Sequence, residues 1–247
     1  MRYFAIVSYR GTSYCGWQKQ TISKLPSIEE SIEHVLGRIL SQEIKIYGSG
    51  RTDAGVHALG QTFHFDTSKE LDCNKLMHSM NELLPKDIRI LELKTVDENF
   101  HARFSAVSKT YIYKIRNAKT SSAFHSDLEW TLGQPLDIEK MREAAEIFKG
   151  EHNFQNFTSK EDDEQKFTRN IGVFEVNCVN SDIEVLIKGN GFMRYMVRMI
   201  VGNLVQVGLG KLKPSDIKSE LENPVRKPSS HKAPAYGLYL KEVNYEN

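Results

Sequence analysis

The feature that most constrains the fold is one order of predicted elements that recurs in the two halves of the chain. In the first half, alternating and amphipathic patterns predict a strand, a helix, two strands, a second helix and a strand. The first helix has a capping box, Ser27-x-x-Glu30, which is typical of a helix N-terminus. The expected ranges are a strand at 2–9, a helix from Ser27, strands at 43–48 and 60–66, a helix at 73–84 and a strand at 88–96.

The second half repeats this order and adds one short helix. Asp137 caps a helix that we expect to end at Gly150, and Pro214 opens the short helix. The other expected ranges are strands at 107–116, 170–178, 182–189 and 237–244 and a long apolar helix at 192–208. Two copies of a split β-α-β pattern predict an α+β protein with two ferredoxin-like lobes, at 1–105 and 106–247.

The composition is that of an ordinary globular protein, with 40% hydrophobic and 26% charged residues among 247. No apolar run approaches the roughly 20 residues that a membrane-spanning helix needs. The first residues follow a strand pattern and not that of a signal peptide. We therefore expect a cytoplasmic protein without a membrane partner.

The net charge of +1 hides an uneven distribution of basic residues. Residues 101–119 and 188–213 each contain several Lys and Arg side chains and no acid. Such segments form either a phosphate-binding surface or a solvated basic face, and charge alone favours neither.

The cysteines and histidines do not have the spacing of a metal site. Cys15, Cys73 and Cys178 are odd in number and far apart, without a C-x-x-C pair, so we expect three buried structural thiols. His57 and His64 are seven apart on a predicted strand and point to opposite faces, and no H-E-x-x-H motif is present. The sequence therefore predicts no metal.

The densest group of chemically useful residues lies in the glycine-rich run Gly48–Ala58 between two predicted strands. Its three glycines permit unusual backbone conformations and a close approach by a substrate. Asp53 stands two residues after Arg51, whose charge favours an ionised carboxylate, as a nucleophile requires. The alternative is an ordinary turn, in which Gly and Asp are common. The run lacks the Gly-Lys-Ser/Thr of a P-loop, and the chain has no serine nucleophile elbow.

Two further patterns suggest an RNA-binding role. Arg194 and Arg198 are four residues apart in the predicted apolar helix, where like charges repel and a buried cation needs a partner. We therefore expect one of them to contact an anion, either Asp53 or a phosphate. The alternative is that both lie on a solvent-exposed edge of the helix. Tyr111 and Tyr113 share one face of a strand among lysines, as in sites that hold unstacked nucleotides. The commoner alternative for these tyrosines is the core.

The run Gly50–Ala58, Gly-Arg-Thr-Asp-Ala-Gly-Val-His-Ala, resembles the signature of the tRNA pseudouridine synthase A family. Five other segments resemble family segments in the same order, and together they span essentially the whole chain. These segments are Tyr14–Gln18, Phe100–Ala106, Tyr111–Tyr113, Met196–Gly202 and Ala233–Leu240.

The resemblance implies the fold, the activity and the partners. It implies two ferredoxin-like lobes whose antiparallel or mixed sheets join, with a central RNA-binding cleft, and a homodimer. The implied reaction converts uridine to pseudouridine in tRNA, at positions 38–40 of the anticodon stem-loop, without a cofactor or metal. Asp53 takes the place of the catalytic aspartate and Tyr111 that of the active-site tyrosine. Arg51 and Arg198 match the basic residues that bind the substrate.

Two departures from the family leave room for another target. Relatives vary at Arg194-Tyr195, and Ala235-Tyr236-Gly237 stands where Ala-Glu-Gly is usual. The alternatives are the same chemistry on ribosomal RNA, a non-catalytic RNA-binding protein, and a phosphate-transferring enzyme that uses the glycine-rich run.

Overall fold

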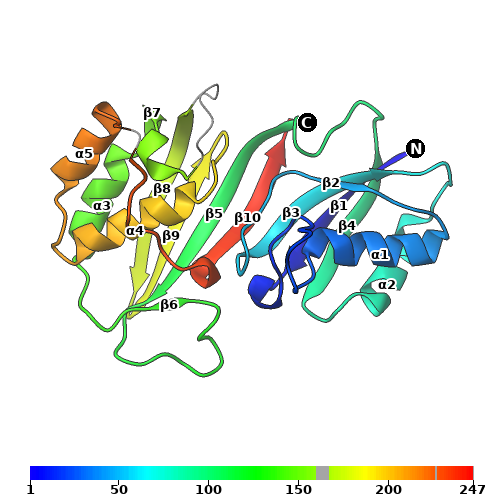
Figure 1. Cartoon of the computed structure of the whole chain (residues 1–247), viewed down its shortest axis with the longest axis horizontal. Helices are drawn as coiled ribbons and strands as arrows, with labels where there is room; N and C mark the ends of the chain where they lie inside the picture. Colours follow the sequence, from blue (N-terminus) through cyan, green and yellow to red (C-terminus); the bar gives the residue numbers. More distant parts are fainter. Residues whose placement is uncertain (160–166, 226, 247) are drawn as a thin grey trace. The chain divides into compact units, whose positions relative to one another are not determined.

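Ten strands and five α-helices form in the part of the chain that the computed structural model describes, residues 1–159, 167–225 and 227–246. This confirms the expected mixture of helices and sheet (Figure 1). The chain divides into two compact units, Met1–Val107 with the chain from Tyr239 on, and Ser108–Leu238. None of the helices in the described ranges is long and apolar enough to cross a membrane.

Unit 1 has the element order that the sequence predicts for the first half. Its elements are β1 (Arg2–Tyr9), α1 (Ile28–Leu40), β2 (Ile46–Gly48), β3 (His57–Asp66), α2 (Cys73–Leu83) and β4 (Ile88–Val96). β1 pairs antiparallel with both β3 and β4, and β2 pairs antiparallel with β3, so the strands lie in the order β4-β1-β3-β2. α1 contacts α2 and β2, and α2 packs on β4 (Figure 1).

The start of α1 follows from its sequence. The Ser27 side chain accepts a hydrogen bond from the Glu30 backbone N–H at 3.0 Å, as the capping pattern predicts. The Glu30 carboxylate forms an ion pair with Lys19 at 3.1 Å. The helix ends where Ser41 takes a left-handed conformation with φ +52°.

The last strand, β10 (Leu238–Tyr245), belongs with unit 1. It runs parallel to β3, with Tyr239 opposite His57 and Leu240 opposite Ala58. The sequence placed this strand in the range 106–247, so the contacts of the fold group it differently. The division into two ferredoxin-like lobes stays a prediction.

Most of the strands of unit 2 pair antiparallel. Its elements are β5 (Ala106–Arg116, which begins at the end of unit 1), β6 (Trp130–Thr131), α3 (Ile138–Ile147), β7 (Gly150–Asn153), β8 (Thr168–Val179), β9 (Asp182–Gly189), α4 (Met196–Gly208) and α5 (Pro214–Glu222). β9 pairs with both β5 and β8, and β7 pairs with β8. α3 packs on β8 and contacts α4 and α5 (Figure 1).

Two helix ends differ from the prediction. α3 ends at Ile147, because the chain turns into β7 at Gly150, whose φ is +92°. α4 begins at Met196, four residues after the expected start at 192, because Tyr195 takes a left-handed conformation with φ +62° and ψ +2°. A left-handed residue ends the helical path, so Arg194 lies before the helix.

The prediction of three buried thiols is wrong for two of them. Cys15 is buried, but Cys73 and Cys178 are half-buried. Cys73 is the first residue of α2, and Cys178 lies next to the end of β8, where its thiol contacts the Asn180 carbonyl at 3.6 Å. Both positions are at element ends, where the core no longer covers the side chain.

Candidate active site

Asp53 lies half-buried in the middle of the loop that joins β2 to β3, which we call the Asp53 loop (residues 49–56). A turn closes where the Val56 N–H donates to the Asp53 carbonyl at 3.1 Å. Gly55, the third residue of this turn, has φ +77°, a value that glycine adopts without strain. The turn therefore requires the glycine of the Asp-Ala-Gly sequence.

The segment around Trp17 packs directly on the Asp53 loop. Gly16 forms an isolated β-bridge with Asp53, and the Trp17 N–H donates to the Thr52 carbonyl at 3.1 Å. A Cβ atom on Gly16 would lie 2.5 Å from the Thr52 carbonyl oxygen, and one on Gly48 would lie 2.6 Å from the Trp17 ring. Only glycine fits at these two positions, so the loop and the tryptophan segment have matching shapes.

Buried, uncharged side chains of β1 and β3 also hold the Asp53 loop. The Ser49 hydroxyl donates to the Gln61 carboxamide oxygen at 2.6 Å, and the Gln61 amide donates to the Gly50 carbonyl at 3.0 Å. The Thr52 and Tyr9 hydroxyls form a hydrogen bond of 2.8 Å. Burial raises the pKa of Tyr9 far above its ordinary value, so its hydroxyl stays protonated. No pattern in the sequence indicates that Tyr9 and Gln61 support the loop.

Arg51 shares the loop with Asp53 but is exposed. Burial raises the pKa of Glu29, and the Lys19 backbone N–H and the positive charge of Arg51 oppose that rise. Arg51 is therefore close enough to the start of α1 to influence a carboxylate there. That the charge of Arg51 favours the ionised form of the Asp53 carboxylate stays a prediction.

The two histidines of β3 have structural partners. His57 is buried, its Nδ1 accepts the Gly11 N–H at 3.0 Å, and its ring stacks on Tyr239 with centroids 4.6 Å apart. His64 is also buried and accepts the Ala102 N–H at 3.2 Å. Within the described ranges, no three His, Cys, Asp or Glu side chains gather in a way that could hold a metal ion.

The two tyrosines of β5 lie in unit 2 and are both buried. Tyr111 meets Phe192 edge to face, with ring centroids 5.1 Å apart. Tyr113 donates its hydroxyl to the Pro234 carbonyl at 2.8 Å, and a Cβ atom on Gly237 would lie 2.6 Å from its ring. Burial raises the pKa of Tyr113 far above its ordinary value. Tyr113 is thus a core tyrosine, the commoner alternative noted from the sequence.

Arg194 and Arg198 do not form the expected pair along a helix. Instead three cations surround the Tyr195 ring, with the Lys232 Nζ at 4.3 Å and the Cζ atoms of Arg194 and Arg198 at 4.8 and 5.2 Å from its centroid. Arg194 and Lys232 are exposed. Arg198 is half-buried, and its Nε donates to the Ala233 carbonyl at 2.8 Å. We call residues 194–198 with Lys232 the Tyr195 cluster.

The predicted site residues therefore fall in two groups. Asp53 and Arg51 lie in unit 1, and Tyr111 and Arg198 lie in unit 2. The Asp53 loop offers a carboxylate on a fixed turn, and the Tyr195 cluster offers a concentration of positive charge. These are the parts that nucleophilic chemistry on an anionic polymer requires.

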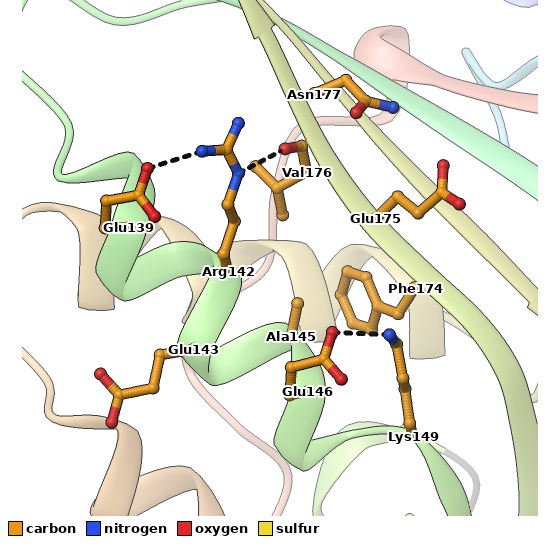
Figure 2. A pocket seen from close by; sticks show the side chains of 10 residues that line it. All are labelled: Glu139, Arg142, Glu143, Ala145, Glu146, Lys149, Phe174, Glu175, Val176 and Asn177. Atoms are coloured by element: carbon orange, nitrogen blue, oxygen red, sulfur yellow. Dashed lines mark hydrogen bonds and ion pairs between the residues drawn. The ribbon is translucent and has the colours of Figure 1, made fainter.

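A surface depression between α3 and β8 contains none of the predicted residues (Figure 2). Its two cations are already paired, Arg142 with Glu139 and Lys149 with Glu146, each at 2.6 Å. Two further carboxylates, Glu143 and Glu175, leave the depression with an excess of negative charge. It would repel a phosphate and is not an RNA site.

Comparison with known proteins gives matches over nearly the whole chain. Residues 5–105 and 144–246 match the profile of a family described as tRNA pseudouridine synthase. The chain is 40% identical over 249 residues to tRNA pseudouridine synthase A of Bacillus pumilus (strain SAFR-032), and the match covers 100% of both proteins. It is 40% identical over 245 residues to tRNA pseudouridine synthase A of Pseudothermotoga lettingae, covering 99% of each. It is 39% identical over 239 residues to tRNA pseudouridine synthase A 2 of Clostridium tetani, covering 97% of this chain and 96% of the relative.

Proposed function

Because the chain belongs to the tRNA pseudouridine synthase family, we propose that it isomerises uridine to pseudouridine in tRNA with Asp53 as the nucleophile. The uridines at positions 38–40 of the anticodon stem-loop are the proposed targets. The enzyme is an isomerase, because the reaction only moves the bond between ribose and base.

The reaction breaks the bond from ribose C1′ to uracil N1 and forms a bond from C1′ to C5. The proton on C5 is lost and N1 gains one, so nothing is oxidised and nothing is consumed. No cofactor is therefore needed. The target uridine has to leave its stack before a side chain can reach these atoms.

The observation that carries this proposal is the held position of Asp53. Backbone bonds from Val56 and Trp17 and the buried side chains of Tyr9 and Gln61 hold the loop on either side of the carboxylate. A nucleophile on a fixed turn loses little conformational freedom when it attacks. The Asp53 carboxylate attacks C1′ of the ribose or C6 of the base, and the detached uracil rotates before it rejoins through C5.

The other predicted residues act around this step. Arg51 and Arg198 bind the substrate and favour the ionised form of the Asp53 carboxylate. The Tyr111 ring stacks on the uracil and assists removal of the proton from C5. The enzyme acts in the cytoplasm as a homodimer, in which two copies contact one tRNA.

The proposal is tested with purified protein and unmodified RNA transcripts. Wild-type protein should form pseudouridine in tRNA and not in ribosomal RNA, read by chemical mapping of each transcript. Asp53→Asn should abolish the product yet leave tRNA binding within a few fold, because the carboxylate acts covalently. Turnover of this variant near the wild-type rate would reject Asp53, and product in ribosomal RNA alone would reject the target.

A further inference from the structure

A turn at the end of unit 1, His101–Ser105, presents an exposed aromatic ring beside an exposed cation. The Phe104 side chain is 76% exposed, although large apolar side chains usually lie inside. The Arg103 guanidinium lies 5.6 Å from the centroid of the Phe104 ring. None of the described acids forms an ion pair with Arg103.

The backbone of this turn is tightly held. The Ser105 N–H donates to the His101 carbonyl at 2.9 Å, and the His101 N–H donates to the Ser105 hydroxyl at 3.0 Å. The N–H groups of Arg103 and Phe104 both point at His101 Nδ1, at 3.1 and 3.4 Å. The exposed ring is therefore attached to an ordered backbone and does not sit on a loose loop.

Ala102 ties the turn to the sheet of unit 1. It is fully buried, its N–H donates to His64 Nδ1 at 3.2 Å, and its carbonyl accepts the Tyr245 hydroxyl at 2.8 Å. The three residues in the middle of this surface turn thus use two imidazoles and one phenol as partners. This is more support than an ordinary connection between strands requires.

The rings beneath Phe104 form an uncharged base. Centroid distances are 4.4 Å from Phe104 to His101, 4.6 Å from His101 to His64, and 5.1 Å from His64 to Tyr47. Because each histidine accepts N–H donors at Nδ1, both imidazoles are neutral. Burial and then the charge of Arg2 lower the pKa of both rings, that of His64 to about 4.

We propose that Phe104 is a stacking site for an unpaired nucleobase of RNA and that Arg103 contacts a neighbouring phosphate. The inference rests on the proposed function in taking RNA as the partner. A flat ring that is ordered before binding loses little freedom when a base stacks on it, and stacking does not depend on which base is present. The adjacent cation binds the backbone that such a base carries. The site would hold a nucleotide other than the one that reacts at Asp53.

The test compares tRNA binding by variants at this turn. Phe104→Ala should weaken the binding of an unmodified tRNA transcript about tenfold, while kcat at saturating tRNA stays within about twofold. Phe104→Trp should restore the affinity, because an indole also stacks. Leu91→Ala is the matched control, because Leu91 is a 53% exposed apolar side chain on β4 of the same unit. Equal affinity of Phe104→Ala and wild type would overturn the proposal, as would a loss that Phe104→Trp does not repair.

Fluorescence gives a second readout that does not depend on activity. The indole of Phe104→Trp should be quenched by a stem-loop RNA with unpaired loop bases, and much less by a fully paired duplex of equal length. Equal quenching by both would overturn stacking. A change in the oligomeric state of Phe104→Ala in solution would also overturn the proposal, because it would place the ring between two copies of the chain. Repeating the binding assay in the Asp53→Asn background separates the stacking proposal from the proposed function. A chain that cannot isomerise uridine should still lose affinity for tRNA when Phe104 is replaced by Ala, if a base stacks on this ring.

Discussion

The Asp53 loop and the Tyr195 cluster differ in what holds them. Around Asp53 the contacts are backbone hydrogen bonds, a packed tryptophan and the neutral side chains of Ser49 and Gln61. Around Tyr195 the contacts are three cations that face one ring. The contacts described for the loop are therefore ones that neither salt nor moderate pH changes affect, whereas those of the cluster depend on charge.

The difference matches two separate tasks. A nucleophile must keep its geometry under all conditions, and neutral buried hydrogen bonds provide that. Three neighbouring cations repel one another, and each contact between a solvated cation and the half-buried Tyr195 ring contributes only about 0.5–1 kcal/mol. The phosphates of RNA would relieve this repulsion, so we expect the Tyr195 cluster to be most stable with RNA bound.

Replacement of the arginines should give the largest effects and tests whether the Tyr195 cluster has one task or two. Arg198→Met should lower kcat about 100-fold, because the resemblance places Arg198 at the catalytic aspartate, a contribution typical of a positioned charge. Arg194→Met should raise KM a few fold and leave kcat unchanged, because Arg194 is exposed before α4. Steady-state kinetics on a tRNA transcript measure both. If the two variants behave alike, Arg198 is a phosphate contact and nothing more.

Loss of the buried amide below Asp53 should give the next largest effect. Gln61→Ala removes the bonds to Ser49 and Gly50 and should lower kcat about tenfold with little change in KM. It should also lower the free energy of unfolding by about 1–3 kcal/mol, because buried partners are left unsatisfied. Gln134→Ala, at an exposed glutamine of unit 2, is the control in urea unfolding and in kinetics. A Gln61 variant with full kcat but reduced stability would show that the amide supports the fold and not the carboxylate.

Salt should separate the two regions directly. Binding of tRNA should weaken steeply between low and physiological salt, since the acid-free segments 101–119 and 188–213 offer several phosphate contacts. Lys232→Met should reduce the slope of log Kd against log salt by about one, because one contact to a phosphate is lost. Gln61→Ala should leave the slope unchanged. A wild-type binding constant that does not vary with salt would mean that the basic segments do not contact RNA.

Acid should have a small effect on unit 1 through His64. Its folded pKa of about 4 lies below the ordinary value of 6.5, so the unfolded chain binds the proton first. The stability that the neutral ring contributes is present above pH 6.5 and is lost as the pH falls toward 4. His64→Asn keeps an acceptor for the Ala102 N–H without titrating in this range. Urea unfolding at pH 7 and pH 4.5 should show a smaller loss for the variant, and equal losses would remove His64 as the cause.

Local signals were sufficient for most of the fold. Ser27 and Asp137 cap α1 and α3 as predicted, because a capping side chain and the backbone N–H that donates to it are only three residues apart. The error at α4 has the opposite origin. No local pattern in an apolar run predicts that a tyrosine takes a left-handed conformation. Tyr195 takes it next to a long-range contact, in which the Thr158 hydroxyl donates to the Arg194 carbonyl at 3.0 Å.

The sequence by itself determined the family of this protein, the mixture of helices and strands, and the position of Asp53 in a glycine-rich loop. Those properties depend on neighbouring residues and on motif spacing, which a linear chain displays. Only the tertiary structure decided that Trp17, Tyr9 and Gln61 hold the loop, and that two histidines support the turn at Phe104. These contacts join segments that are far apart in the chain or that share no periodic pattern, so they exist only once the strands have paired in register.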